Sequence, residues 1–142
     1  MLFRSDVVDE AHDTHHPITV AETFEAQRDA SIEAARAFTG GRLAQRLDYF
    51  ADVLAASPTG WLLGDGSPSY VDLALFQLVE GLKYAFPNAM GAVCPSRTDA
   101  HRRAVSEIDA IAEYLKSERR LAFNEHGIFR RYPELDRPND GR

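Results

Sequence analysis

The chain has 142 residues, of which 44% are hydrophobic and 27% charged, and its formal net charge at pH 7 is -6. This composition is typical of one folded globular domain, and it excludes a disordered chain or one that spans a membrane. The acidic charge argues against nucleic acid as a partner, because a phosphate backbone would repel the chain unless it kept a separate basic patch. The single cysteine, Cys94, allows no internal disulfide. We therefore expect a cytoplasmic protein.

The first third of the chain predicts helix. From Val7 to about Thr39 the sequence is polar and rich in alanine, with few β-branched runs. Pro17 leaves two possibilities open, because a proline either separates two helices or kinks one. Gly40-Gly41 is expected to end this segment. A helix over 42–56 follows, whose apolar residues at Leu43, Leu47, Phe50 and Leu54 recur at helical spacing and predict a buried face.

The next helix is predicted to begin at Ser69. The Ser69 hydroxyl can cap the free amides of the first turn, and Asp72, three residues later, can accept from the Ser69 amide in a capping box. Downstream the helix is apolar around much of its circumference, which predicts the central and most buried helix of the fold. Pro87 is expected to close it. Its main stripe consists of Val71, Leu75, Leu78 and Leu82.

The last part of the chain predicts one more packed helix and a tail. Residues 88–97 are rich in turn formers, and a helix ending near Ser117 follows. Residues 121–132 show no helical or strand period, and we expect them to lie against the body. The end, 137–142, is expected to be frayed. The predicted fold is all-α, a bundle of about five helices with an irregular C-terminal tail. The apolar face expected of the last helix consists of Val105, Ile108, Ala112 and Leu115.

Three motifs in order suggest a family. They are Tyr49-Phe50-x-x-Val53-Leu54, then Trp61-Leu62-x-Gly64, then Ser69-Tyr70-x-Asp72-x-x-Leu75-Phe76. Together they resemble the C-terminal, all-helical domain of glutathione S-transferases, and the resemblance covers residues 6–136. In that family the Ser/Thr-x-x-Asp capping box, matched by Ser69 and Asp72, is important for folding.

The resemblance implies a function for the domain. A full-length enzyme carries a thioredoxin-like N-terminal domain that binds glutathione, and nothing of that domain precedes Asp6 in this sequence. Leu2-Phe3-Arg4-Ser5 matches what a sequencing adapter encodes when translated, which suggests a non-native start over residues 1–5 and a truncated reading frame. The chain would form the hydrophobic acceptor-substrate site and part of the dimer interface for conjugation of glutathione to electrophiles. It is expected to be inactive alone. The alternative is a stand-alone helical protein-interaction module without catalysis.

The resemblance also implies site residues. No catalytic residue is expected in this chain, because the Tyr, Ser or Cys that contacts the sulfur belongs to the thioredoxin-like domain. Asp13 and His16 are the nearest matches to residues that reach glutathione across the dimer interface. Phe123, Ile128 and Phe129 would wall the hydrophobic substrate site. The implied partners are the thioredoxin-like domain, a small hydrophobic electrophile and a second copy of the chain, with glutathione as co-substrate.

The densest polar cluster is His12-Asp13-Thr14-His15-His16. On a helix His12 would share a face with His15 or His16, and this spacing can bind a divalent metal, with Asp9 or Asp13 as a carboxylate ligand. No His-Glu-x-x-His motif occurs, and Pro17 disturbs the helix at this place. The cluster is interpreted first as a solvated or interface group, and no metal is assigned from the sequence.

Cys94 is a weak candidate for a nucleophile. It lies in Val93-Cys94-Pro95, without an adjacent histidine or helix start to lower the pKa of its thiol. A partly buried, inert thiol is expected.

Overall fold

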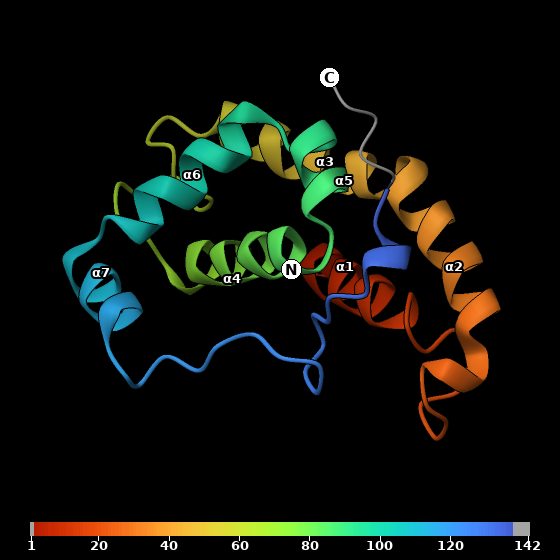
Figure 1. Ribbon diagram of the computed structural model, residues 1–142. Coiled ribbons are helices and arrows are strands. Elements are labelled where there is room, and N and C mark those ends of the chain that lie inside the picture. Colours follow the sequence, from red (N-terminus) through yellow and green to blue (C-terminus); the bar gives the residue numbers. More distant parts are fainter. Residues whose placement is uncertain (1, 138–142) are drawn as a thin grey trace.

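The computed structural model describes residues 2–137 and shows an all-α fold, which confirms the expected fold class (Figure 1). Over these residues there are seven α-helices, where about five were expected, and no strand. No helix within 2–137 is long and apolar enough to cross a lipid bilayer. The α-helices are α1 (Leu2–Asp13), α2 (Arg28–Ala37), α3 (Leu43–Ala56), α4 (Tyr70–Ala85), α5 (Pro87–Val93), α6 (Ser96–Ser106) and α7 (Asp109–Lys116).

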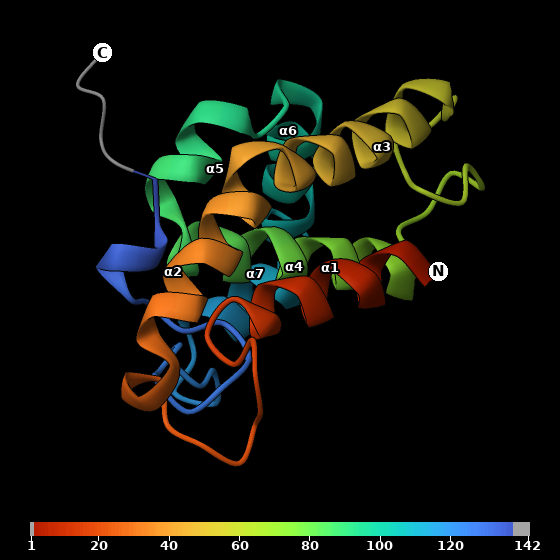
Figure 2. The same ribbon diagram turned by 90° about the vertical axis from the view of Figure 1, so that its right-hand side faces the viewer.

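Helix α4 is the centre of the core, as its composition predicts. It packs against α1, α5 and α6, and Figure 2 shows it between α1 and the layer of α3 and α6. Four of its apolar residues are at most 1% exposed, and they belong to the same hydrophobic core cluster as the buried face of α3 that the sequence also predicts. The four apolar residues of α4 are Leu75, Leu78, Val79 and Leu82, and the buried residues of α3 are Leu43, Leu47, Phe50 and Leu54.

The predicted capping box opens α4. Both of its reciprocal hydrogen bonds are present, and the Ser69 amide donates to the Asp72 carboxylate at 2.8 Å. The other Asp72 oxygen accepts from the Leu62 amide at 2.9 Å and from His101 Nε2 of α6 at 2.8 Å. Asp72 is fully buried. One carboxylate therefore ties the start of α4 to the preceding loop and to α6.

Two separate helices occupy the first third of the chain, so the possibility of one kinked helix is excluded. Between α1 and α2, the buried side chain of Gln27 organises the loop that contains Pro17. Its oxygen accepts from the amides of Ile18 and Thr19, at 3.0 and 3.3 Å, and its nitrogen donates to the Thr19 carbonyl at 2.9 Å. A buried glutamine here satisfies backbone groups that no helix pairs.

The expectation that Gly40-Gly41 ends a helix is wrong. Residues Phe38–Arg42 form a π-helical turn that joins α2 directly to α3, and Figure 2 shows the two helices running in different directions on either side of it. Neither glycine has a positive φ. The wider π turn changes the direction of the helix axis without interrupting the helical chain, and single π turns commonly occur within helices in this way.

The helical part after Pro87 also differs from the expectation. Pro87 does close α4, but it is also the first residue of a new helix, α5. Proline is favoured at that position because the first amide of a helix has no partner within the helix, and because the ring fixes φ near the helical value. The turn-rich interpretation of 88–97 is therefore wrong over most of that range. The single helix expected up to Ser117 is two, because Ile108 has an extended ψ of 124° between α6 and α7.

The C-terminal segment lies against the body, as expected. Tyr132 stacks on Phe24 with ring centroids 3.9 Å apart, and Phe129 and Leu135 are buried. The Asp136 carboxylate accepts from the first free amides of α5, those of Asn88 and Ala89, at 2.7 and 3.0 Å. Of the end predicted to be frayed, residues 138–142 lie outside the described residues.

Candidate functional site

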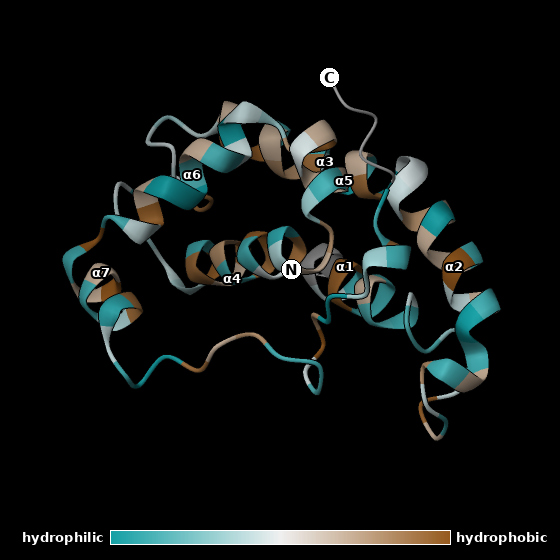
Figure 3. Ribbon diagram, in the orientation of Figure 1, coloured by the Kyte–Doolittle hydropathy of each residue, from teal (hydrophilic) through white to brown (hydrophobic). Residues whose placement is uncertain are grey.

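An open groove lies between α4, α7 and the segment that follows α7. Figure 1 shows this segment returning from α7 toward α1. The groove has a volume of about 600 Å³, and Val8 of α1 forms part of its wall. Figure 3 shows hydrophobic residues along α4 and on α7. A concave and mostly apolar surface with few polar groups is the usual form of a small-molecule site.

All three residues predicted for the hydrophobic substrate site line this groove. They differ in exposure: Ile128 is 44% exposed, Phe123 is half-buried, and Phe129 is 9% exposed. Phe123 stacks on Tyr84 with centroids 5.0 Å apart and meets Phe129 edge-on at 6.3 Å. Ile128 is thus the accessible member, while Phe129 belongs mainly to the core. Their role toward a substrate stays a prediction.

Sequence reasoning missed the opposite walls of the groove. Leu73 and Phe76 of α4 and Ile111 and Tyr114 of α7 also line it. Helix α7 is amphipathic, yet none of its residues is buried. A strongly amphipathic helix whose apolar face finds no core marks a binding surface. That signal was in the sequence, but Leu115 and its neighbours were interpreted as core.

Asp13 and His16, predicted to reach glutathione across a dimer, lie at the end of α1. Asp13 has a side chain that is 70% exposed, on the rim of a small hollow of about 140 Å³ that Arg42 also lines. His16 is half-buried, with Nδ1 3.2 Å from Gln27 Nε2 and Nε2 3.1 Å from a guanidinium nitrogen of Arg130. Of the two residues only Asp13 lines this hollow, and their role in glutathione binding stays a prediction.

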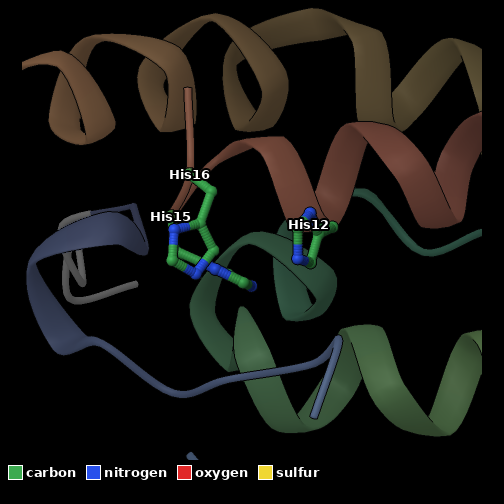
Figure 4. Close-up of side chains that lie close together, drawn as sticks. All are labelled: His12, His15 and His16. Carbon is green, nitrogen blue, oxygen red and sulfur yellow. The ribbon is translucent and has the colours of Figure 1, made fainter. Parts of the chain in front are cut away.

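The histidines of the predicted polar cluster converge, as Figure 4 shows. Ring centroids lie 4.8 Å apart for His12 and His15, 5.2 Å for His12 and His16, and 4.9 Å for His15 and His16. Burial lowers the pKa of His15 to about 4, although its hydrogen bond to the Ile128 carbonyl acts in the other direction. Burial and the nearby Arg130 charge also lower the pKa of His16. The His15 ring is therefore neutral at pH 7, and the His16 ring is less readily protonated than a free imidazole.

Cys94 is half-buried at the end of α5, and burial raises the pKa of its thiol, with the negative charge of Asp99 adding to the effect. A protonated thiol is a poor nucleophile. We expect iodoacetamide at pH 7.5 to alkylate Cys94 at least several-fold more slowly than free cysteine, and to react fully once the chain is unfolded in urea. Mass spectrometry of quenched time points measures both rates. Equal rates in the folded chain would show a reactive cysteine instead.

Comparison with known proteins identifies the domain. A search of curated proteins finds no match. The family model described as "Glutathione S-transferase, C-terminal domain" matches residues 12–118, a range that contains α2 to α7 and the capping box of α4. This chain belongs to the family of glutathione S-transferase C-terminal domains.

Proposed function

We propose that this chain forms the acceptor-substrate half of a cytoplasmic glutathione transferase. The observation that carries the proposal is the apolar groove between α4, α7 and residues 121–129. Its accessible apolar side chains, among them Leu73, Tyr114 and Ile128, are each more than 40% exposed. A surface of this kind favours a small hydrophobic electrophile as the ligand.

The described lining of the groove offers glutathione two guanidinium groups for its carboxylates but no carboxylate for its ammonium group. The polar side chains among its described lining are those of Gln77, Arg119, Arg120, Asn124 and the tyrosine Tyr114. The same lining contains no histidine, cysteine or carboxylate. A thioredoxin-like partner domain, docked beside the groove, would bind glutathione and bring its sulfur to the acceptor. This chain alone is therefore expected to be inactive, and a homodimer remains part of the proposal.

The proposed reaction is an attack of the glutathione thiolate on an electrophilic carbon of the acceptor. The sulfur forms the new bond with its electron pair, and the leaving group departs with the pair of the bond that breaks. Hydrogen-bond donors in the partner domain would favour the thiolate by lowering the thiol pKa. This chain would hold the acceptor at reacting distance and keep water from the apolar side.

A hydrophobic fluorescent probe, anilinonaphthalene sulfonate, tests the groove directly. We expect the folded chain to bind it saturably, and Ile128→Asp to weaken binding roughly tenfold, because the carboxylate would lose water on meeting the probe. The control is Ile18→Asp, since Ile18 is 70% exposed and does not line the groove. Fluorescence titration gives both affinities, and near-ultraviolet circular dichroism checks that each variant is folded. Equal weakening by both variants, or by neither, would contradict the assignment of the groove.

The second candidate is a protein-interaction module without catalysis, favoured by the same exposed apolar side chains. A glutathione conjugation assay separates the two candidates when a thioredoxin-like domain is supplied in cis as a fusion. Conjugation that Ile128→Asp impairs supports the transferase. A folded fusion that binds glutathione but conjugates no hydrophobic electrophile supports the module.

A further inference from the structure

The end of α1 gathers three histidine side chains around one point. His12 lies in the last turn of α1, His15 lies in the turn directly after the helix, and His16 follows it. One ring nitrogen from each lies within 4.8 Å of the others. The turn is fixed by hydrogen bonds from the His15 amide to the His12 carbonyl, at 3.1 Å, and from the Thr14 hydroxyl to the Ala11 carbonyl, at 2.7 Å. The backbone therefore presents the three rings together before any ligand arrives.

His15 is prepared as a metal ligand. Its Nε2 lies 2.9 Å from the Ile128 carbonyl and donates to it, while the buried Nδ1 has no hydrogen-bond partner. Donation from one ring nitrogen to a carbonyl fixes the tautomer and leaves the lone pair on the other, which is the usual arrangement around a metal-bound histidine. The whole residue is 1% exposed. A buried acceptor without a donor costs stability unless something binds it.

His16 meets polar groups of the protein at both ring nitrogens, and hydrogen bonds to the backbone carbonyls of Thr19 and Glu22 act to raise its pKa. Gln27 Nε2 faces its Nδ1 and the Arg130 guanidinium faces its Nε2, so an N–H donor lies against each ring nitrogen. A neutral imidazole has only one acceptor nitrogen, and the two contacts cannot both be hydrogen bonds. Arg130 also donates to the Gly127 carbonyl at 2.8 Å. Its guanidinium can keep that bond while it leaves His16 Nε2 free for another ligand.

We propose that His12, His15 and His16 bind one divalent transition-metal ion of the zinc class. Imidazole nitrogen is a preferred ligand of Zn²⁺, and three histidines with one open position form a known type of zinc site. Bonds of about 2.0–2.1 Å in a tetrahedral site put ligand nitrogens about 3.3 Å apart. The side chains would thus close by about 1.5 Å from their largest present separation. Rotation about side-chain bonds supplies such a movement.

Two charged groups beside the site act in opposite directions. Asp13 Oδ1 is 3.8 Å from His12 Nδ1, where its negative charge favours a bound cation and its carboxylate can take the fourth position. The positive charge of Arg130 opposes the cation. Because His15 also holds the Ile128 carbonyl, the ion would fix α1 to the wall of the groove.

Zinc titration of the whole chain, expressed without a polyhistidine tag and freed of metal by a chelator, tests the site. Isothermal calorimetry at pH 7.5 is expected to give one Zn²⁺ per chain. His12→Gln and His16→Gln should each weaken binding at least about tenfold. The control is His126→Gln, since His126 is exposed and outside the cluster; it should bind as the unchanged chain does. Arg130→Gln should tighten binding several-fold, because a repelling charge is removed.

Cobalt gives a second readout that does not depend on the stability of a variant. Co²⁺ bound by three imidazoles in four-coordinate geometry should give visible absorption bands, which Zn²⁺ abolishes at one equivalent. Binding that both histidine variants leave unchanged, or Co²⁺ spectra of the hexa-aqua ion, would overturn the proposal. The proposed transferase function does not depend on this outcome, because probe binding in the groove is measured in metal-free buffer.

Discussion

Asp72→Ala is expected to lower the free energy of unfolding by about 3–5 kcal/mol, as removal of one partner from a buried polar network does. The variant leaves the amides of Leu62 and Ser69 and the Nε2 of His101 without their acceptor. All of this happens at a residue that is fully buried. Urea denaturation followed by circular dichroism measures the change.

Two variants separate the network from the cap. Ser69→Ala removes only the cap hydroxyl and should cost about 1 kcal/mol. Asp52→Ala removes an exposed carboxylate of α3 and should change stability by less than about 0.5 kcal/mol. If Asp72→Ala costs no more than Ser69→Ala, the bonds to Leu62 and His101 contribute nothing, and the residue is only a helix cap.

The same carboxylate gives the chain a pH dependence of known sign. Burial acts to raise the pKa of Asp72, but hydrogen bonds from the Leu62 amide, His101 and Ser69 outweigh it and hold the pKa below its ordinary value of 3.8. The folded state therefore binds this proton less readily than the unfolded state does. The contribution of Asp72 to the free energy of unfolding is complete above the ordinary pKa of the carboxyl group. It is lost as the pH falls through the lower pKa that Asp72 has in the folded state. Asp72→Asn should flatten the loss of stability below pH 4.

Sequence reasoning found the parts of the fold that short-range patterns determine. The buried faces of α3 and α4 follow from apolar residues three and four apart, and the capping box follows from Ser69 and Asp72 three apart. The contact of Asp72 with His101 of α6 could not be predicted from the sequence, because 29 residues separate the two. No local pattern specifies such a contact.

The groove shows the same limit. Its chemistry was predicted at Phe123, Ile128 and Phe129 by resemblance, but its shape depends on a break at Ile108 that turns α7 away from α6. Apolar spacing continues across that break, so the period alone predicts one helix. Likewise the spacing of His12, His15 and His16 is visible in the sequence. The contacts that prepare them, from Gln27, Ile128 and Arg130, are 11 to 114 residues away.

Gly81→Ala is expected to destabilise the chain although it adds a better helix former to α4. Alanine inside a helix is favoured over glycine by about 1 kcal/mol, and a glycine in this buried helix needs another reason. An added Cβ would overlap ring atoms of Phe129, including Cγ near the root of that side chain, so the ring cannot simply rotate away. Overpacking of this kind costs about 1–3 kcal/mol. The contact is what lets residues 127–129 wall the groove.

The variant should therefore act through the C-terminal segment. We expect Gly81→Ala to lower the urea midpoint, to speed proteolysis between residues 121 and 132, and to weaken the groove's affinity for the fluorescent probe. Gly91→Ala is the matched control: Gly91 is also helical, but an added Cβ there meets no atom within 4 Å. That control should be neutral or stabilising by up to about 1 kcal/mol.

Measuring Gly81→Ala in a second variant of the chain tests whether its effect on stability changes sign. In a chain that already carries Phe129→Ala, the obstacle is gone, and Gly81→Ala should become stabilising by up to about 1 kcal/mol through helix propensity alone. A destabilisation of equal size in both backgrounds would mean that Gly81 serves the helix in some way unrelated to Phe129. A change of sign would instead show that position 81 is a glycine because Phe129 of the C-terminal segment packs directly against it. The same contact would then fix the position of the groove wall.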